Sequence, residues 1–295
     1  MKKLLSVAIL LIFPLLFVEA KPIKQVQAIE PKEFIRVKKV DGKVSALEIA
    51  VTRYQSRDGN VTVDLVGVVH IGDSTYYNQL NRRFPKYDAV LYELVAPQGT
   101  KPEKKRKDDL SSLLPKMISF MLDLDMQLAL IDYDKKNFIH ADLSFDEMLE
   151  SVKDKGDDKL TIALSVLVDM LKQNNLKNKP GEEPDFSKAI ENPNLLKQQM
   201  ASQMVNSLEL GATMKRLLVD ARNKKACEVL VTEMKNGKKS IAIFYGAAHN
   251  NDFDKRLRTD HGFICINQEW LTAWGNLDGP PTPPAFRFMK LLMEK

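Results

Sequence analysis

Two stretches of the chain share one pattern of apolar and polar positions. In each, an apolar run rich in β-branched residues ends in Gly-x-x-His-x-x-Asp, and a helical pattern follows. The first stretch is 61–73, with His70 as its histidine, and the second is 240–252, with His249. Ligands of open α/β sheets bind at the carboxyl ends of strands. The chain has only four histidines, so two in this position predict an active site split between two strands.

The other positions of the two motifs have structural interpretations. Asp73 and Asp252 are predicted to be helix N-caps, because a carboxylate accepts hydrogen bonds from the first-turn N–H groups. Gly67 and Gly246 indicate a close backbone approach or a positive φ angle. One histidine after a strand is more typical of packing than of ligand binding. The repetition of the same setting favours a functional role.

The remaining pattern predicts a mixed α/β domain. Residues 57–60 read as the turn of a β-hairpin, and Ser144 and Glu147 form a capping box that begins a helix. Gly237 follows the last long helix as its C-terminal stop. We expect strands at 44–54, 61–69, 88–95, 240–245 and 262–267, and helices at 73–84, 110–130, 160–171, 193–236 and 252–258. This order predicts a mixed central β-sheet flanked by helices, with a helical insertion at about 100–190.

The ends of the chain have a different composition from this domain. Residues 1–20 combine Lys2 and Lys3, an apolar run and a small-residue cleavage site, which together are typical of a signal peptide. The apolar run is shorter than the ~20 residues that span a bilayer, so we expect a cleaved signal and no membrane anchor. The sequence then predicts an N-terminal linker at 21–43, the domain at 44–270 and a proline-containing tail at 271–295. The protein is expected to be periplasmic or secreted.

Charge and cysteine content narrow the choice of partners. The net charge is +5, and removal of residues 1–20 lowers it to +4. The basic run at 101–107 has no interleaved aromatic residues and is typical of a solvated loop, so nucleic acid is not an expected partner. Cys227 and Cys265 are the only two cysteines. A disulfide between them is compatible with export, but their separation in space does not follow from the sequence.

Glu93 stands out within the apolar strand predicted at 88–95. A buried carboxylate without a partner costs several kcal/mol, so Glu93 needs a metal ion, a lysine or an arginine such as Arg222. Two histidines and a carboxylate match a divalent transition-metal site with open positions for water or substrate. We therefore expect His70, Glu93 and His249 to lie at one end of the sheet, with an ion-pair role for Glu93 as the alternative.

These motifs resemble those of the TraB/PrgY/GumN family, which includes the Tiki proteins. The resemblance covers about 45–270 and rests on both Gly-x-x-His motifs, on Leu91-Tyr92-Glu93, and on the segment Asp220-Ala221-Arg222-Asn223 before the second motif. It implies a fold similar to the erythromycin-esterase and ChaN-like group. Tiki proteins are described as metal-dependent proteases that act on extracellular peptides and require the two histidines and the glutamate.

The resemblance also implies roles for individual residues. It assigns His70, His249 and Glu93 as metal ligands, and Glu93 and Arg222 as catalytic residues. The segment 137–142 is similar to a block in bacterial members, which adds His140 as a further metal ligand and Asp142 as a candidate. A hydrogen-bonded loop position is the alternative for His140.

Three functions follow as expectations. The first is hydrolysis of a peptide or ester bond with a divalent Mn, Co or Zn ion, in which a peptide or small molecule is the substrate. The second is haem or iron binding of the ChaN-like type without catalysis, for which histidine and tyrosine are suitable axial ligands. The candidate tyrosines for that role are Tyr76, Tyr77, Tyr92 and Tyr245. The third is a protein without catalytic activity, whose degenerate site serves only in export or in binding a partner.

Overall fold

The structure is a computed structural model that describes residues 27–102, 119, 121–151, 192–206 and 212–283. The predicted signal peptide, the helix expected at 160–171 and residues 110–118 and 120 of the helix expected at 110–130 lie outside these residues. In the described remainder, residues 119, 121 and 122 are helical, but a short strand, β6 (Asp125–Met126), and the single turn α3 (Gln127–Leu130) follow, so one continuous helix over 110–130 is wrong. No helix of the described residues is long and apolar enough to cross a membrane.

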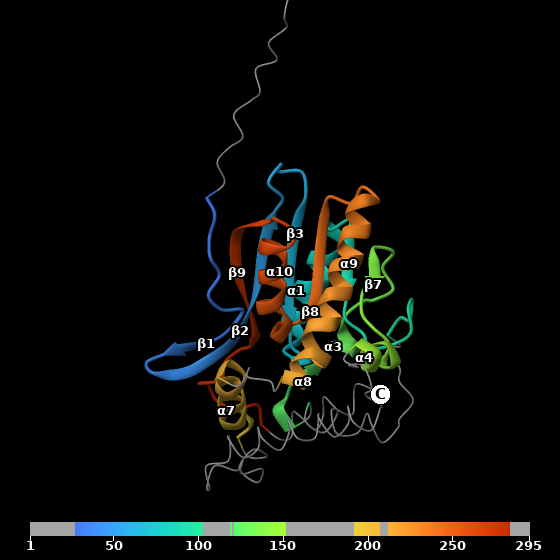
Figure 1. Cartoon of the computed structure of the whole chain (residues 1–295). Helices are drawn as coiled ribbons and strands as arrows, with labels where there is room; N and C mark the ends of the chain where they lie inside the picture. Colours follow the sequence, from blue (N-terminus) through green and yellow to red (C-terminus); the bar gives the residue numbers. More distant parts are fainter. Residues whose placement is uncertain (1–26, 103–118, 120, 152–191, 207–211, 284–295) are drawn as a thin grey trace, which may run out of the picture.

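The α/β architecture with a mixed central sheet is confirmed. β2 (Lys43–Gln55) and β3 (Thr62–Val68) form the expected antiparallel hairpin. From β3 the sheet continues in parallel through β8 (Ser240–Gly246), β5 (Ala89–Tyr92) and β7 (Phe138–His140). The carboxyl ends of four parallel strands therefore lie along one edge of the sheet (Figure 1).

Three strands differ from their expected extents. β1 (Ile35–Val40) lies within the stretch predicted to be a linker and pairs with the first half of β2. β7 lies within the predicted helical insertion but pairs with β5, so this part of the segment belongs to the sheet. β9 (Ile264–Trp274) is longer than expected and pairs with β2. A strand of three residues is too short to give a periodic signal, which explains why β7 is not visible in the sequence.

The helices follow the predicted order along the chain. α1 (Ser74–Arg83) follows the first motif, α10 (Asn250–Thr259) follows the second, and α9 (Ala221–Lys235) precedes β8. Gly237 stops α9 with a φ of 86°, as expected for its position. The other elements are β4 (Ile71–Gly72), the 3-10 turns η1 (Phe84–Lys86) and η3 (Ala247–His249), α4 (Phe145–Ser151), α7 (Pro193–Asn206), α8 (Ala212–Lys215) and the π-helical turn η2 (Arg216–Asp220).

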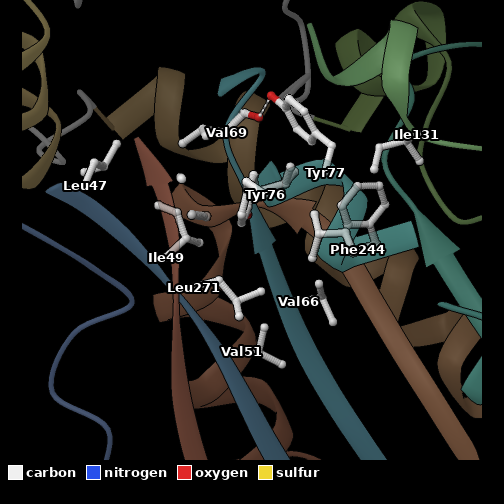
Figure 2. Close-up of a cluster of buried hydrophobic side chains, with 14 of the residues drawn as sticks. Leu47, Ile49, Val51, Val66, Val69, Tyr76, Tyr77, Ile131, Phe244 and Leu271 are labelled. Atoms are coloured by element: carbon white, nitrogen blue, oxygen red, sulfur yellow. Dashed lines mark hydrogen bonds between the residues drawn. The ribbon is translucent and has the colours of Figure 1, made fainter. Parts of the chain in front are cut away.

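Side chains of the parallel strands alternate between two hydrophobic clusters, as the period of a strand requires. Ala242 and Phe244 of β8 pack on the side of α1, with its buried Tyr76 and Tyr77 (Figure 2). The odd-numbered β8 residues pack instead against α9 and α10. In β5, Ala89 and Leu91 also belong to the α9 side. Glu93 continues this odd register, so its side chain leaves the strand end toward α9.

The glycines and aspartates of the motifs have specific contacts. A Cβ atom on Gly67 would lie 2.8 Å from both Asn250 Nδ2 and Ile49 Cγ2, so this glycine permits a close approach. Both aspartates differ from the N-cap prediction. Asp73 occupies the N-cap position of α1, but its carboxylate accepts the Gly275 N–H at 2.7 Å. Asp252 lies inside α10, where Arg256 donates to it. The Gly275 N–H for Asp73, and the side chains of Arg256 in the same helix and of Asn223 in α9 for Asp252, replace the first-turn N–H groups as donors.

The structure confirms the predicted capping box and answers the question of the disulfide. Ser144 and Glu147 form the predicted capping box at α4, since the Ser144 N–H donates to the Glu147 carboxylate at 2.8 Å and the Glu147 N–H donates to the Ser144 hydroxyl at 3.3 Å. Cys227 and Cys265 are both buried and free, so the disulfide left open by the sequence is not formed.

Candidate active site

Three parallel strands bring the predicted residues to one edge of the sheet. Val68 of β3 pairs with Gly246 of β8, so His70 and His249 follow adjacent strand ends. Glu93 comes directly after β5, and its N–H donates to the Phe244 carbonyl at 3.2 Å. Glu93 Oε1 lies 3.6 Å from His249 Nε2. The expected proximity of Glu93 and His249 is confirmed.

Glu93 is tied to a buried arginine and to the backbone of the second motif. Arg222 Nη2 donates to Glu93 Oε1 at 2.6 Å, and the Gly246 N–H donates to Glu93 Oε2 at 2.5 Å. A Cβ on Gly246 would lie 3.2 Å from Glu93 Oε2. This glycine therefore leaves room for the carboxylate against the backbone.

The carboxylate of Asp142 accepts two hydrogen bonds from the same guanidinium group of Arg222. Arg222 Nε and Nη2 donate to its two carboxylate oxygens at 2.9 and 2.6 Å. Such a bidentate pair fixes the guanidinium plane as well as its charge. Arg222 Nη1 further donates to the Leu218 carbonyl. Arg222 thus makes all these contacts within the protein, so the geometry favours the ion pair with Glu93 that the sequence offered for it, and a role in holding Glu93 in place.

The charge of this buried group is not balanced. The side chains of Asp142, Arg222 and Glu93 are 0%, 7% and 12% exposed. Two carboxylates share one guanidinium, which leaves one excess negative charge. An unpaired buried charge is costly, so the cluster attracts a proton or another cation. His249 is the group that faces it.

Two opposing effects set the pKa of Glu93. Burial alone would raise this pKa, but the charges of His249, Arg222 and His70 and the Gly246 N–H outweigh it and lower the pKa to about 2. Burial lowers the pKa of His249 below its usual range, so its ring is neutral at neutral pH. Arg222 is then the fixed charge that keeps Glu93 ionised.

The lowered pKa of Glu93 predicts a pH dependence of stability. The ordinary pKa is 4.5 and the folded value is about 2, so the unfolded chain binds the proton more tightly. The stabilisation from Glu93 is complete above pH ~4.5 and decreases as the pH falls toward ~2. We expect Glu93→Gln to flatten the curve of unfolding free energy against pH in this window, as measured by urea denaturation. An unchanged curve would contradict the buried ionised state.

Asn223 fixes the tautomer of His249. Asn223 Nδ2 donates to the His249 carbonyl at 3.1 Å and to Asp252 at 2.9 Å, and neither partner can donate in return. The amide oxygen of Asn223 must therefore face His249 Nδ1, which lies 2.6 Å away. The proton of the neutral ring is thus on Nδ1, and the lone pair of Nε2 faces Glu93.

His70 is held by a second carboxamide in a similar way. Gln127 Oε1 lies 3.0 Å from His70 Nδ1, and the Gln127 N–H donates to the His70 carbonyl at 2.8 Å. Gln127 Nε2 in turn donates to the Tyr133 hydroxyl at 2.8 Å. Each motif histidine therefore has its Nδ1 bound to an amide oxygen, which leaves Nε2 as the atom available for a ligand.

In the structure, His140 is a hydrogen-bonded residue that supports a loop, which is the alternative to its predicted role as a metal ligand. The Gly99 N–H donates to its Nδ1 at 3.1 Å, and its Nε2 lies 2.7 Å from the Leu94 carbonyl, to which it donates. Both ring nitrogens are occupied by the loop after β5, so in this arrangement His140 has no lone pair for a metal. His140 supports the loop that carries Glu93.

The described residues do not contain three or more His, Cys, Asp and Glu side chains grouped so that they could hold a metal ion. Glu93 and His249 are the predicted ligands that are in direct proximity. His70 lies at the same edge and is close enough for its charge to act on the pKa of Glu93. A site with three ligands would need a movement of the His70 side chain toward the other two.

Sequence reasoning did not find Asn223 and Gln127, the two residues that orient the histidines. Asn223 follows Arg222 directly in the segment 220–223, and this position is the only signal in the sequence for its role. Gln127 has no signal in the sequence, because its contact depends on a chain segment 57 residues from His70.

Comparisons with known proteins add no further evidence on identity. No family model, curated protein or solved structure matches this chain.

Proposed function

We propose that this protein is an exported metal-dependent hydrolase that acts on a peptide or ester bond. The observation that carries the proposal is the lone pair of His249 Nε2 beside the ionised Glu93, in a cluster with one excess negative charge. Two acceptors that face each other at 3.6 Å need a positive charge between them. The resemblance of the motifs to the TraB/PrgY/GumN family supports the same function.

The donors fit a divalent transition metal in their chemistry. Bonds of about 2.1 Å from imidazole and carboxylate place two ligands of one ion within about 4.2 Å of each other, and the observed separation is 3.6 Å. Metal-binding histidines usually donate their other N–H to an oxygen, as His249 does to Asn223. His249 and Glu93 would hold the ion, and His70 Nε2 would be the third ligand. Bound there, a divalent ion would supply Lewis-acid chemistry, namely the activation of water and the polarisation of a carbonyl group.

The chain's own residues supply positioning and proton transfer. Where Glu93 is not itself a ligand, it has the position for a general base, since its carboxylate faces His249 and is ionised at neutral pH; its lowered pKa makes it a weaker base than an ordinary glutamate. Arg222 and the Gly246 N–H hold that carboxylate in one orientation, and Asp142 holds Arg222. Asn223 keeps the His249 ring in the tautomer that presents Nε2.

The haem- or iron-binding alternative receives less support from the tyrosines. The hydroxyls of Tyr76, Tyr77, Tyr92 and Tyr245 donate to the carbonyls of Gly67, Val69, Thr100 and Ala141. Burial raises the pKa of each of them, which disfavours the tyrosinate form that binds iron. These tyrosines are explained by the packing of the sheet.

The function is tested with quenched fluorescent peptides and nitrophenyl esters. We expect hydrolysis that stops with a chelator and returns with Mn, Co or Zn, and a rate at least 100-fold lower in Glu93→Gln, because general-base catalysis contributes about 10²–10⁴. Asp58→Asn, in an exposed turn, is the control and should retain the rate. If Glu93 is only a base, the variant still binds metal; if it is a ligand, binding falls as well. Hydrolysis that is insensitive to both chelator and Glu93→Gln would contradict the proposal.

A further inference from the structure

A cavity of about 610 Å³ lies at the end of the sheet opposite the candidate active site. Ser240, the first residue of β8, lines it, whereas the last residue of that strand, Gly246, contacts Glu93. The last turn of α1 and the following turn η1 form another wall through Arg82, Arg83 and Lys86. The cavity is therefore separate from the cluster of Glu93, His249 and Arg222.

Positive charge dominates the lining of this cavity. Four cationic side chains, Arg53, Arg82, Arg83 and Lys86, reach it together with a single acid, Glu269. Glu269 pairs with Arg83 at 2.6 Å. Arg82 and Lys86 have no ion-pair partner among the described residues. Basic residues in the last turn of a helix favour its dipole, but this effect does not explain why a β2 arginine converges on the same space.

The β2 arginine is held in a fixed orientation. Arg53 Nε and Nη2 donate to the two carboxylate oxygens of Asp64, both at 2.8 Å. The Tyr87 hydroxyl donates to the same carboxylate at 2.6 Å, and the Asp64 side chain is only 1% exposed. This arrangement holds the guanidinium at the cavity through Nε and Nη2, and Nη1 makes no hydrogen bond within the described residues, so a ligand can be bound with little loss of side-chain entropy.

The chemistry of the lining indicates the class of ligand. Guanidinium groups bind phosphate oxygens in a two-point geometry that an ammonium group does not provide. The Ser240 hydroxyl and the Gln79 amide add neutral donors. With Arg53 paired to Asp64 and Arg83 to Glu269, Arg82 and Lys86, which are both exposed, are the two cations left to bind a ligand, and they favour one with at least two negative charges. The volume lies within the ~300–1,000 Å³ of small-molecule sites and exceeds what a single inorganic phosphate fills.

We propose that this cavity binds a small molecule that carries phosphate groups with two or more negative charges. The site is independent of the proposed hydrolase chemistry, since no residue is shared between the two. An occupant would contact α1, η1, β2 and the start of β8, and α1 and β8 both lead to the motif histidines at the other end of the sheet.

The test uses inorganic pyrophosphate as the probe and isothermal titration of the purified protein. We expect saturable 1:1 binding and a Kd at least roughly tenfold higher in the double variant Arg82→Gln/Lys86→Gln, because it removes both unpaired cations. The matched control is Lys38→Gln/Lys39→Gln on β1, which removes the same charge from an exposed strand and should keep the Kd within about twofold. Circular dichroism establishes that both variants are folded.

Three outcomes would overturn this proposal. The first is an absence of pyrophosphate binding to the wild-type protein. The second is an equal loss of affinity in the two double variants, which would show attraction by net charge alone. The third is tight binding of a single-stranded oligonucleotide that pyrophosphate does not displace and that Arg82→Gln/Lys86→Gln abolishes, since the surface would then serve an extended polyanion.

Discussion

Replacing Arg222 by methionine is expected to lower the free energy of unfolding by roughly 3–5 kcal/mol, the cost of removing one partner from a buried ion pair. Methionine retains the apolar length of the side chain but leaves Glu93 and Asp142 buried beside each other without a cation. Urea denaturation of the purified protein measures the change. Lys135→Gln removes one side of a more exposed ion pair with Asp132 and should cost less than about 1 kcal/mol.

A second variant separates the charge imbalance from general damage to the core. Adding Asp142→Asn to Arg222→Met removes one of the two unpaired carboxylates, so the double variant should be more stable than Arg222→Met alone. A loss below about 1 kcal/mol in Arg222→Met, or no recovery in the double variant, would contradict the buried arrangement of two carboxylates on one guanidinium.

The parts of the fold that the sequence predicted are those with a repeated local pattern. The hairpin of β2 and β3, the helix after each motif and the glycine stop at Gly237 all follow from periodicity and turn chemistry. Glu93 was visible because an acid within an apolar run has few structural explanations. Two histidines in one setting placed the site at the edge where the parallel strands end.

What the sequence did not predict depends on contacts between distant segments. β7 has three residues, and only its pairing with β5 makes it a strand. Asp73 and Asp252 are of a residue type that is common at N-caps, but their carboxylates accept hydrogen bonds from the distant residues Gly275 and Asn223. The tautomer of His249 follows from the acceptors of the Asn223 amide, which are the His249 carbonyl and the Asp252 carboxylate.

The basic residues that gather in space also could not be predicted from the sequence. The run at 101–107 is the obvious basic cluster in the sequence. The cationic cavity is instead assembled from Arg82, Arg83 and Lys86 of α1 and η1 and from Arg53 of β2, which lies about 30 residues before them along the chain. Their convergence depends on how α1 packs against the sheet.

The second large effect concerns metal affinity. His70→Ala and His249→Ala should each lower the affinity for Mn, Co or Zn by well over tenfold, because each removes one ligand from a site with few ligands. His70 is exposed, so His70→Ala should leave the stability of the fold unchanged. The His249 side chain is buried and bonded to Asn223, so His249→Ala should still fold but with lowered stability. A histidine that only packs would show its loss in stability alone.

The most direct test of the proposed metal site is a titration of Zn²⁺ into the wild-type protein and the two histidine variants, with the melting temperature of each metal-free protein recorded alongside. We expect one tightly bound ion in the wild type and a dissociation constant more than tenfold higher in both variants. The metal-free melting temperature of His70→Ala should be close to that of the wild type, and that of His249→Ala lower, because His249 is buried. Unchanged zinc affinity in both variants, together with lowered melting temperatures, would show that the paired histidines are structural and that the metal-dependent hydrolase proposal is wrong.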